Sequence, residues 1–120
     1  MRWNVEYTDE FGEWFSMLTD AVQDGIDRTV GLLEVKGPRL PFPHSSGIEM
    51  SRHGHMRELR IQVGGDPWRI FYAFDPRRAA ILLIGGNKAG DDRFYEITVP
   101  LADRLYDVHL IEIQKEGLLP

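Results

Sequence analysis

The sequence contains no cysteine, which excludes disulfide bonds, thiolate metal sites and a cysteine nucleophile. Its longest uninterrupted apolar run, Ala79–Ile84, is far too short to cross a bilayer. The opening residues, MRWNVEYTDEF, lack the apolar core of a secretory signal. The absence of cysteine also fits a reducing compartment. We therefore expect a cytoplasmic protein that does not enter a membrane.

The chain also lacks an excess of positive charge. It has 14 lysines and arginines against 19 aspartates and glutamates, so its net charge is −5. This balance argues against a protein that binds nucleic acid over its whole surface. The charge is uneven, however, because residues 51–95 hold eight basic and five acidic residues, a net of +3. Such a patch can bind phosphate locally, since salt screens charges beyond about 10 Å.

The first third of the sequence predicts one short strand and two helices. Apolar and polar residues alternate over Trp3–Thr8, which is typical of a half-buried strand. Asp9 is the expected N-cap of the first helix. The second helix is expected to restart at Thr19 or Asp20 and to end at the Gly-Pro pair at 37 and 38.

Three more strands are predicted after a connector over 39–54, separated by turns rich in Gly, Pro and Asp. They are Met56–Val63, Trp68–Asp75 and Ala79–Ile84. The last of these is apolar on both faces, so we expect it to be the central strand. A final helix is expected to be capped by Asp91 or Asp92, and to be kinked or restarted at Pro100.

This order of elements predicts a single α+β domain over residues 1–120. We expect a small twisted antiparallel sheet of about four strands, with two N-terminal helices packed on it and one C-terminal helix. The first strand is expected to join the sheet at the edge beside the three-strand meander.

Cationic side chains and one tyrosine lie in or soon after the predicted strands. They are Arg57, Arg60, Arg69, Lys88, Arg93 and Tyr95. Cations on adjacent strands of one sheet make a rigid anion site, and RNA is a plausible anion. Structural roles remain open alternatives: Arg57 can pair with Glu58 on its own strand, and Arg60 can pair with an acidic residue of the N-terminal helices.

The sequence offers little support for a metal or a cofactor. His53 and His55 share one face of an extended segment, and His44 is near in sequence, but no carboxylate completes a ligand set. The segment IGGNKAG lacks the spacing and the following Ser or Thr of a nucleotide-binding loop. We therefore expect neither a metal nor a cofactor.

Several segments, taken in order, carry a family resemblance. They are DEFGEWFSML, VGLLEVKGP, MRELRI, WRIFYAF, AILLIGGNKAGDD and PLADRLYDVHL. Together they resemble the RelE/HigB toxin superfamily of toxin–antitoxin systems, in particular its phage-derived HigB-like branch. The resemblance implies a twisted sheet backed by two N-terminal helices. It also implies a metal-independent endonuclease that cleaves mRNA on the ribosome, and a cognate helix-turn-helix antitoxin as partner.

The resemblance also implies roles for single residues. Arg69 matches the family's arginine that clamps the scissile phosphate, and Arg60 would be a second clamp. Lys88 and Arg93 lie where related toxins carry a basic residue that steadies the leaving group. Tyr95 matches an aromatic residue that stacks on a base, and its hydroxyl could also transfer a proton.

Other assignments stay open at this stage. His55 and Arg57 are candidate RNA contacts, and His55 and Glu58 are both candidates for the general base. One alternative function is a non-catalytic binding module on the same scaffold, which inhibits a protein target such as gyrase or only binds its antitoxin. Another is a homodimer without nuclease activity, and the oligomeric state itself is open. The nuclease hypothesis requires that Arg60, Arg69, Lys88 and Tyr95 converge on one face.

Overall fold

The elements of the fold follow one another in the order expected, with one strand added. A computed structural model describes residues 2–120, and within that range it contains five strands, three α-helices and one short 3-10 helix. They are β1 (Val5–Tyr7), α1 (Asp9–Ser16), α2 (Asp20–Lys36), η1 (Gly37–Arg39), β2 (Ser45–Gly47), β3 (Arg57–Val63), β4 (Asp66–Phe74), β5 (Ala80–Asn87) and α3 (Phe94–Lys115). In this part of the chain, no helix combines the length and the apolar character needed to cross a membrane.

The five strands form one sheet in the order β1-β5-β4-β3-β2. β1 runs parallel to β5, with Val5 opposite Ala80, and the other neighbours are antiparallel. The sheet is therefore mixed and has five strands, not the antiparallel four that we expected. The expected central strand over 79–84 corresponds to β5, which is interior, but the centre of the sheet is β4. β5 is apolar on both faces because both of its edges are paired and both of its faces are covered.

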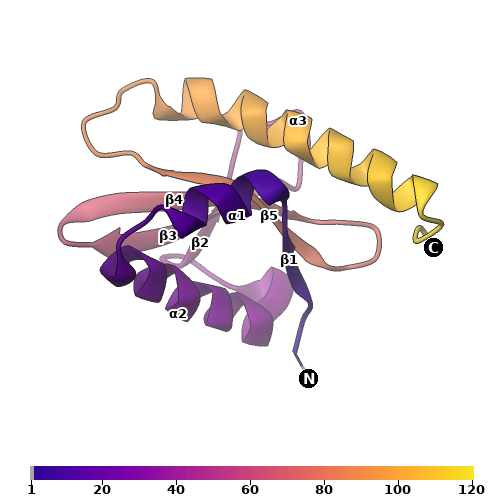
Figure 1. Cartoon of the computed structure of the whole chain (residues 1–120), viewed down its shortest axis with the longest axis horizontal. Helices are drawn as coiled ribbons and strands as arrows, with labels where there is room; N and C mark the ends of the chain where they lie inside the picture. The colour runs from indigo at the N-terminus through magenta and orange to yellow at the C-terminus, as the bar shows by residue number, and fades with distance from the viewer. Residues whose placement is uncertain (1) are drawn as a thin grey trace.

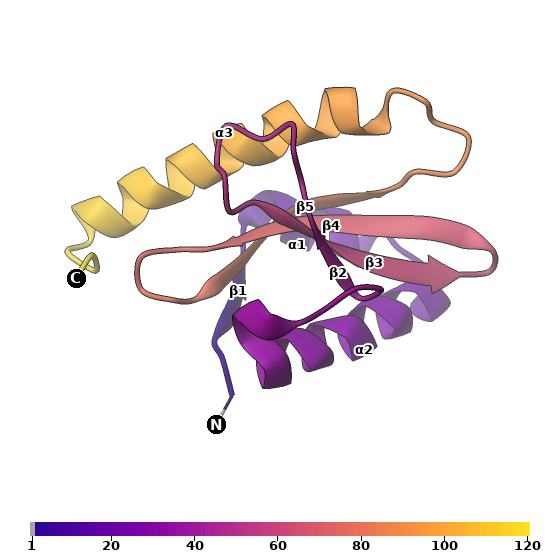
Figure 2. The ribbon, with the colours of Figure 1, turned by 180° about the vertical axis from the view of Figure 1, so that it is seen from behind.

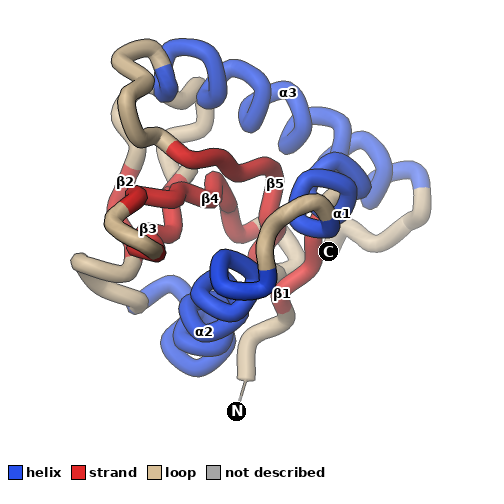
Figure 3. Tube along the Cα trace, turned by 60° about the vertical axis from the view of Figure 1, so that its left-hand side comes forward, coloured by secondary structure: helices blue, strands red, loops and turns tan. Residues whose placement is uncertain are grey.

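Helices cover both faces of the sheet (Figures 1 and 3). Phe11 of α1 and Ile26 and Leu33 of α2 pack on one face, in a cluster with alternate residues of β4 and β5. The residues between them on the same strands point to the other face, where they pack against α3. Side chains that follow one another along β4 and β5 therefore belong to two separate clusters.

Hydroxyl side chains begin the first two helices. Thr8 rather than Asp9 is the N-cap of α1: its Oγ1 accepts a hydrogen bond from the Phe11 amide at 3.0 Å. The same hydroxyl donates to the Leu83 carbonyl at 2.7 Å, so this cap also fastens α1 to the sheet. Thr19 caps α2, as one of the two expected positions.

The last helix is longer and less interrupted than expected. α3 runs through Pro100 as a single helix of 22 residues. Its N-cap position is Arg93 instead of Asp91 or Asp92, although the Asp91 carboxylate accepts a hydrogen bond from the Arg93 amide at 3.0 Å. Pro100 is exposed in the second turn, so the carbonyl that loses its amide donor lies near solvent.

The connector between α2 and β3 contains the strand that sequence patterns did not predict. Seen from behind, it leaves the end of α2 and reaches the far edge of the sheet (Figure 2). There β2 pairs antiparallel with β3, placing Ser46 opposite Glu58. The hydroxyl oxygens of Ser45 and Tyr72 are 2.6 Å apart in the core, which holds this edge to β4.

Candidate functional site

The turn between β3 and β4 brings two of the predicted arginines opposite each other. Arg60 of β3 is paired in register with Arg69 of β4, and Glu58 is paired with Phe71. Residues opposite each other on antiparallel strands point to the same face. Phe71 belongs to the cluster under α3, so Glu58, Arg60 and Arg69 all lie on that face of the sheet.

The centre of this group is the carboxylate of Glu58, which is 5% exposed. Its Oε1 accepts a hydrogen bond from the Tyr95 hydroxyl at 2.6 Å. Its Oε2 accepts from the Ser46 hydroxyl at 2.8 Å and from Arg60 at 3.4 Å. Nε of Arg69 lies 3.6 Å from Oε1. We call these five residues the Glu58 cluster.

Arg69 is the least accessible cation of the Glu58 cluster. Its side chain is 6% exposed, and one guanidinium nitrogen donates to the Trp68 carbonyl at 3.0 Å. Its Nε has no hydrogen-bond partner within residues 2–120. A buried guanidinium lowers the stability of the fold unless an opposite charge lies nearby. The carboxylate of Glu58 supplies that charge for Arg69.

Arg60 and Lys88 form the accessible side of the same site. The Arg60 side chain is 28% exposed, and its guanidinium lies over the Phe42 ring at 4.9 Å. A small pocket of about 120 Å³ lined by Pro43, Arg60 and Arg69 opens beside it. The Lys88 ammonium lies 5.2 Å from the centre of the Tyr95 ring. Lys88, Arg60, Arg69 and Tyr95 therefore converge on one region of one face.

The phenol of Tyr95 is a weaker acid in the Glu58 cluster than in water. Burial raises the pKa of its phenol, and the hydrogen bond to the Glu58 carboxylate raises that pKa further. The hydroxyl is therefore protonated at neutral pH and is a proton donor that points at a carboxylate.

Three predicted site residues do not join the Glu58 cluster. Arg57 lies opposite Tyr72, on the other face of the sheet, and donates to the Ser45 hydroxyl at 3.0 Å. Arg93 is exposed and pairs with Glu96 at 3.2 Å. His55, in the loop before β3, has its Nε2 3.2 Å from the Tyr106 hydroxyl of α3. Ser46 is a member of the Glu58 cluster that was not predicted, because it lies in a connector where no sequence pattern indicated a strand.

Three of the four histidines, His53, His55 and His109, make polar contacts that link α3 to the loops beside the sheet. Asp75, whose side chain is fully buried, accepts hydrogen bonds from His109 and from Arg77. Burial alone would raise the pKa of Asp75, but these hydrogen bonds and one from the Ala79 amide outweigh it and hold the pKa below its usual value. His53 similarly contacts Asp107 at 2.8 Å. Across residues 2–120, no three His, Asp or Glu side chains are grouped so as to hold a metal.

Comparison with known sequences identifies relatives of this chain. Residues 13–107 match the family described as phage derived protein Gp49-like (DUF891). The putative toxin HigB3 of Mycobacterium tuberculosis (strain ATCC 25618 / H37Rv) is 40% identical over 92 residues, which cover 76% of this chain and 79% of that protein. The putative toxin HigB2 of the same strain is 32% identical over 114 residues, or 93% of this chain and 56% of HigB2. This chain thus spans little more than half the length of HigB2.

Comparison with solved structures gives the same fold at low sequence identity. A chain of the archaeal RelE–RelB complex from Pyrococcus horikoshii OT3 aligns with a TM-score of 0.55 at 15% identity, over 75% of this chain and 99% of that chain. A double mutant of E. coli toxin RelE in the free state aligns with a TM-score of 0.57 at 10% identity, over 82% and 96%. These matches confirm the resemblance and the α+β fold expected from the sequence. The chain therefore belongs to the phage-derived Gp49-like family, within the RelE/HigB-like toxin superfamily of toxin–antitoxin systems.

Proposed function

We propose that this protein is the toxin of a toxin–antitoxin pair and an endoribonuclease that cleaves mRNA on the ribosome without a metal, thereby inhibiting translation. The observation that carries the proposal is that Arg60, Arg69 and Tyr95 gather around the Glu58 carboxylate, with Lys88 beside the Tyr95 ring. We also propose a cognate helix-turn-helix antitoxin as its partner. The similar structures of a RelE–RelB complex and of the E. coli RelBE complex support a protein partner.

In the proposed reaction, the 2′-oxygen of the RNA bonds to the adjacent phosphorus and the bond from phosphorus to the 5′-oxygen breaks. Glu58 is buried, so it takes the proton of the 2′-hydroxyl through the Ser46 hydroxyl, which accepts that proton and donates its own to Oε2 of Glu58 at 2.8 Å. Tyr95 gives its proton to the departing 5′-oxygen. The side chains of Glu58 and Tyr95 share a 2.6 Å hydrogen bond, through which the proton on Glu58 can return to Tyr95. His55 is disfavoured as the base because its ring contacts Tyr106, outside the Glu58 cluster.

The two arginines have different roles in this proposal because they differ in exposure. Arg60 is the cation that meets the negative charge of the five-coordinate phosphorane, since a quarter of its side chain faces solvent. Lys88 would assist it from the end of β5. Arg69 is a positioning residue, because it is buried beside Glu58 and sets the orientation of that carboxylate.

A specific observation also favours the second candidate, a non-catalytic binding module. Glu58 neutralises part of the positive charge of Arg60 and Arg69, and the Glu58–Arg69 pair is buried. Such a pair can serve the fold alone. In that case the protein would act by blocking a protein target such as gyrase, or would only bind its antitoxin.

The test is primer extension on mRNA after induction of the protein, together with cleavage of ribosome-bound mRNA by purified protein from which metals were first removed with EDTA, followed by removal of the EDTA. Tyr95→Phe is expected to lower the single-turnover cleavage rate about 100-fold, the usual effect of losing a general acid. Arg60→Gln is expected to lower it as well. Arg104→Gln, which removes an exposed cation of α3, is the matched control and is expected to cleave normally.

The outcome can overturn the proposal in two ways. If Tyr95→Phe and Arg60→Gln are folded, as judged by circular dichroism, and cleave like the wild type, the assigned site is wrong. If the wild type stops growth but no cleavage is seen, while DNA supercoiling by purified gyrase is inhibited, the binding-module function replaces the nuclease.

A further inference from the structure

A second group of cations surrounds a pocket at the C-terminal end of α2. The pocket has a volume of about 580 Å³ and lies where the N-terminal segment, η1 and the β4–β5 turn meet. Its lining includes Lys36, Arg39 and Arg78, together with Trp3 and two prolines. None of these residues belongs to the Glu58 cluster.

The positive charge of this pocket is not neutralised locally. Lys36, Arg39 and Arg78 are all exposed, none of them makes an ion pair with any part of residues 2–120, and no acidic side chain lines the pocket. The acidic residue near Trp3 in the structure, Glu34, faces a different cation, Arg2, at 3.9 Å. Lys36 and Arg39 stand out because they belong to residues 1–50, which have a net charge of −5.

Trp3 is fixed as a flat wall of the pocket. Its amide donates to the Glu34 carbonyl at 2.8 Å, and its ring meets Phe74 edge to face at 5.6 Å. The ring also packs directly on Gly37, where a Cβ would come within 2.4 Å of it. The guanidinium of Arg78 lies 5.3 Å from the ring centre. An aromatic ring with an exposed cation beside it suits a planar ring of a ligand, and the other cations suit its phosphate.

The pocket is joined to the Glu58 cluster by the connector that follows η1. Pro41 lines the cation pocket and Pro43 lines the small pocket beside Arg60 and Arg69. Between them lies Phe42, which is 67% exposed and sits under the Arg60 guanidinium. Three consecutive residues extend at most about 11 Å, so the two sites are near enough to contact one strand. The path alternates cations with aromatic rings, which is how proteins hold single-stranded nucleic acid.

We propose that the pocket formed by Trp3, Lys36, Arg39 and Arg78 binds a phosphate and an adjacent base of the RNA strand whose scissile phosphate lies at the Glu58 cluster. This inference rests on the proposed nuclease function, which it deepens by naming a second RNA contact. A free nucleotide has the same chemistry as one unit of the strand, so the experiment must distinguish the two sources.

The experiment measures binding of a short fluorescent single-stranded RNA, with 2′-O-methyl groups to prevent cleavage, by fluorescence anisotropy at several salt concentrations. The double variant Lys36→Gln/Arg39→Gln is expected to bind about tenfold more weakly than the wild type. The slope of log affinity against log salt is expected to become shallower by about 0.7, the value for one lost phosphate contact on a single strand. On cleavable RNA, KM is expected to rise while the rate at saturation stays unchanged.

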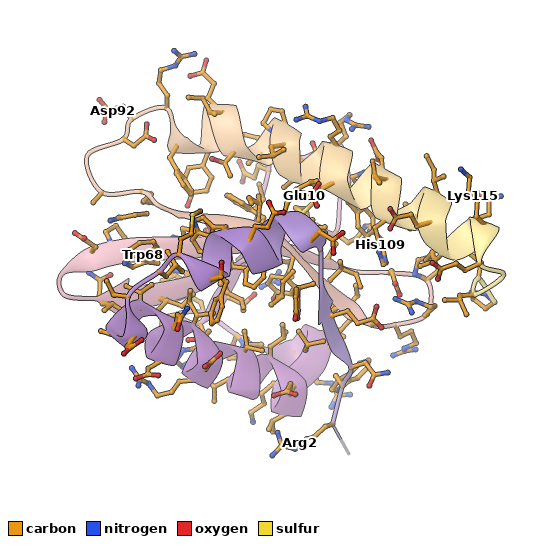
Figure 4. All side chains as sticks on the ribbon, in the orientation of Figure 1. Arg2, Glu10, Trp68, Asp92, His109 and Lys115 are labelled. Carbon is orange, nitrogen blue, oxygen red and sulfur yellow. The ribbon has the colours of Figure 1, made fainter. Side chains whose placement is uncertain are left out.

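The matched control is Arg104→Gln/Lys115→Gln, which removes the same charge from exposed positions of α3. Figure 4 shows Lys115 near the C-terminal end of α3, the helix that lies across the sheet from α2. This control is expected to bind RNA like the wild type. Equal losses in the two double variants would overturn the proposal, because they would reflect net charge alone. So would a loss of AMP binding with no change in RNA binding, which would assign the pocket to a free nucleotide.

The two proposals can fail separately in these assays. If the wild type binds the RNA, the pocket variant loses affinity and no RNA is ever cleaved, then the pocket stands and the nuclease function falls. If cleavage occurs and the pocket variant binds and cleaves normally, the pocket proposal alone is overturned.

Discussion

Replacement of Glu58 by Gln tests how much of the stability depends on one buried charge. Gln keeps one carbonyl oxygen that can accept from the Tyr95 hydroxyl, and its NH2 group can donate to the Ser46 hydroxyl in place of the bond that Ser46 gives to Glu58. The main loss is therefore the negative charge beside Arg69. Both side chains of this pair are 6% exposed. Breaking a buried ion pair by removing one partner costs about 3–5 kcal/mol. We expect about 3 kcal/mol, the lower end, because Arg60 can turn toward water.

The assay is urea unfolding followed by circular dichroism, with two controls. Glu96→Gln removes the partner of Arg93 from an exposed pair, in which the side chains are 61% and 69% exposed, and should change stability by less than about 1 kcal/mol. The double variant Glu58→Gln/Arg69→Met also removes the guanidinium that Glu58→Gln leaves without a carboxylate partner. It should be more stable than Glu58→Gln alone. The reasoning is refuted if Glu58→Gln costs no more than Glu96→Gln, or if the double variant is as unstable as the sum of its single variants.

Three further substitutions test contacts that stabilise the fold outside the Glu58 cluster. Thr8→Ala should lower the free energy of unfolding by about 2 kcal/mol in urea titrations, because it removes both the cap of α1 and the bond to Leu83. Gly85→Ala should destabilise by about 2 kcal/mol and lower the melting temperature, since a Cβ there would lie 2.5 Å from the Trp14 ring. Asp75, whose folded pKa is lowered, adds stability above its ordinary pKa of 3.8 that is lost as pH falls through the folded value. Asp75→Asn should therefore flatten the decline in stability below about pH 5, and an unchanged decline would contradict this account.

The parts of the fold that followed from sequence are those set by local patterns. The two N-terminal helices and the strands β3, β4 and β5 all have clear periodicity or turn residues at their ends. β2 could not be predicted in this way, because Ser-Ser-Gly has no apolar alternation and is held by its backbone and by the contact of Ser45 with Tyr72. The pairing of β1 with β5 is likewise a long-range contact, which no local pattern specifies.

The candidate site likewise has some residues whose positions follow from local sequence patterns and others whose positions depend on long-range contacts. Arg60 and Arg69 face each other because the Gly64-Gly65 turn fixes the register of a hairpin, so their meeting could be inferred from sequence. The approach of Tyr95 to Glu58 depends instead on the path of the loop between β5 and α3. Arg93 lies only two residues before Tyr95. Its absence from the Glu58 cluster could not be predicted, because the path of the same loop sets the direction of its side chain.

The two edges of the sheet have a consequence for how any partner protein can bind. Both edge strands, β1 and β2, have only three residues. An incoming strand would find few free backbone groups at either edge, so growth of the sheet by strand addition is a poor route to a stable complex. The same shortness protects the protein from pairing with copies of itself. A partner that binds tightly must therefore use side chains on the helices and on the open ends of the sheet.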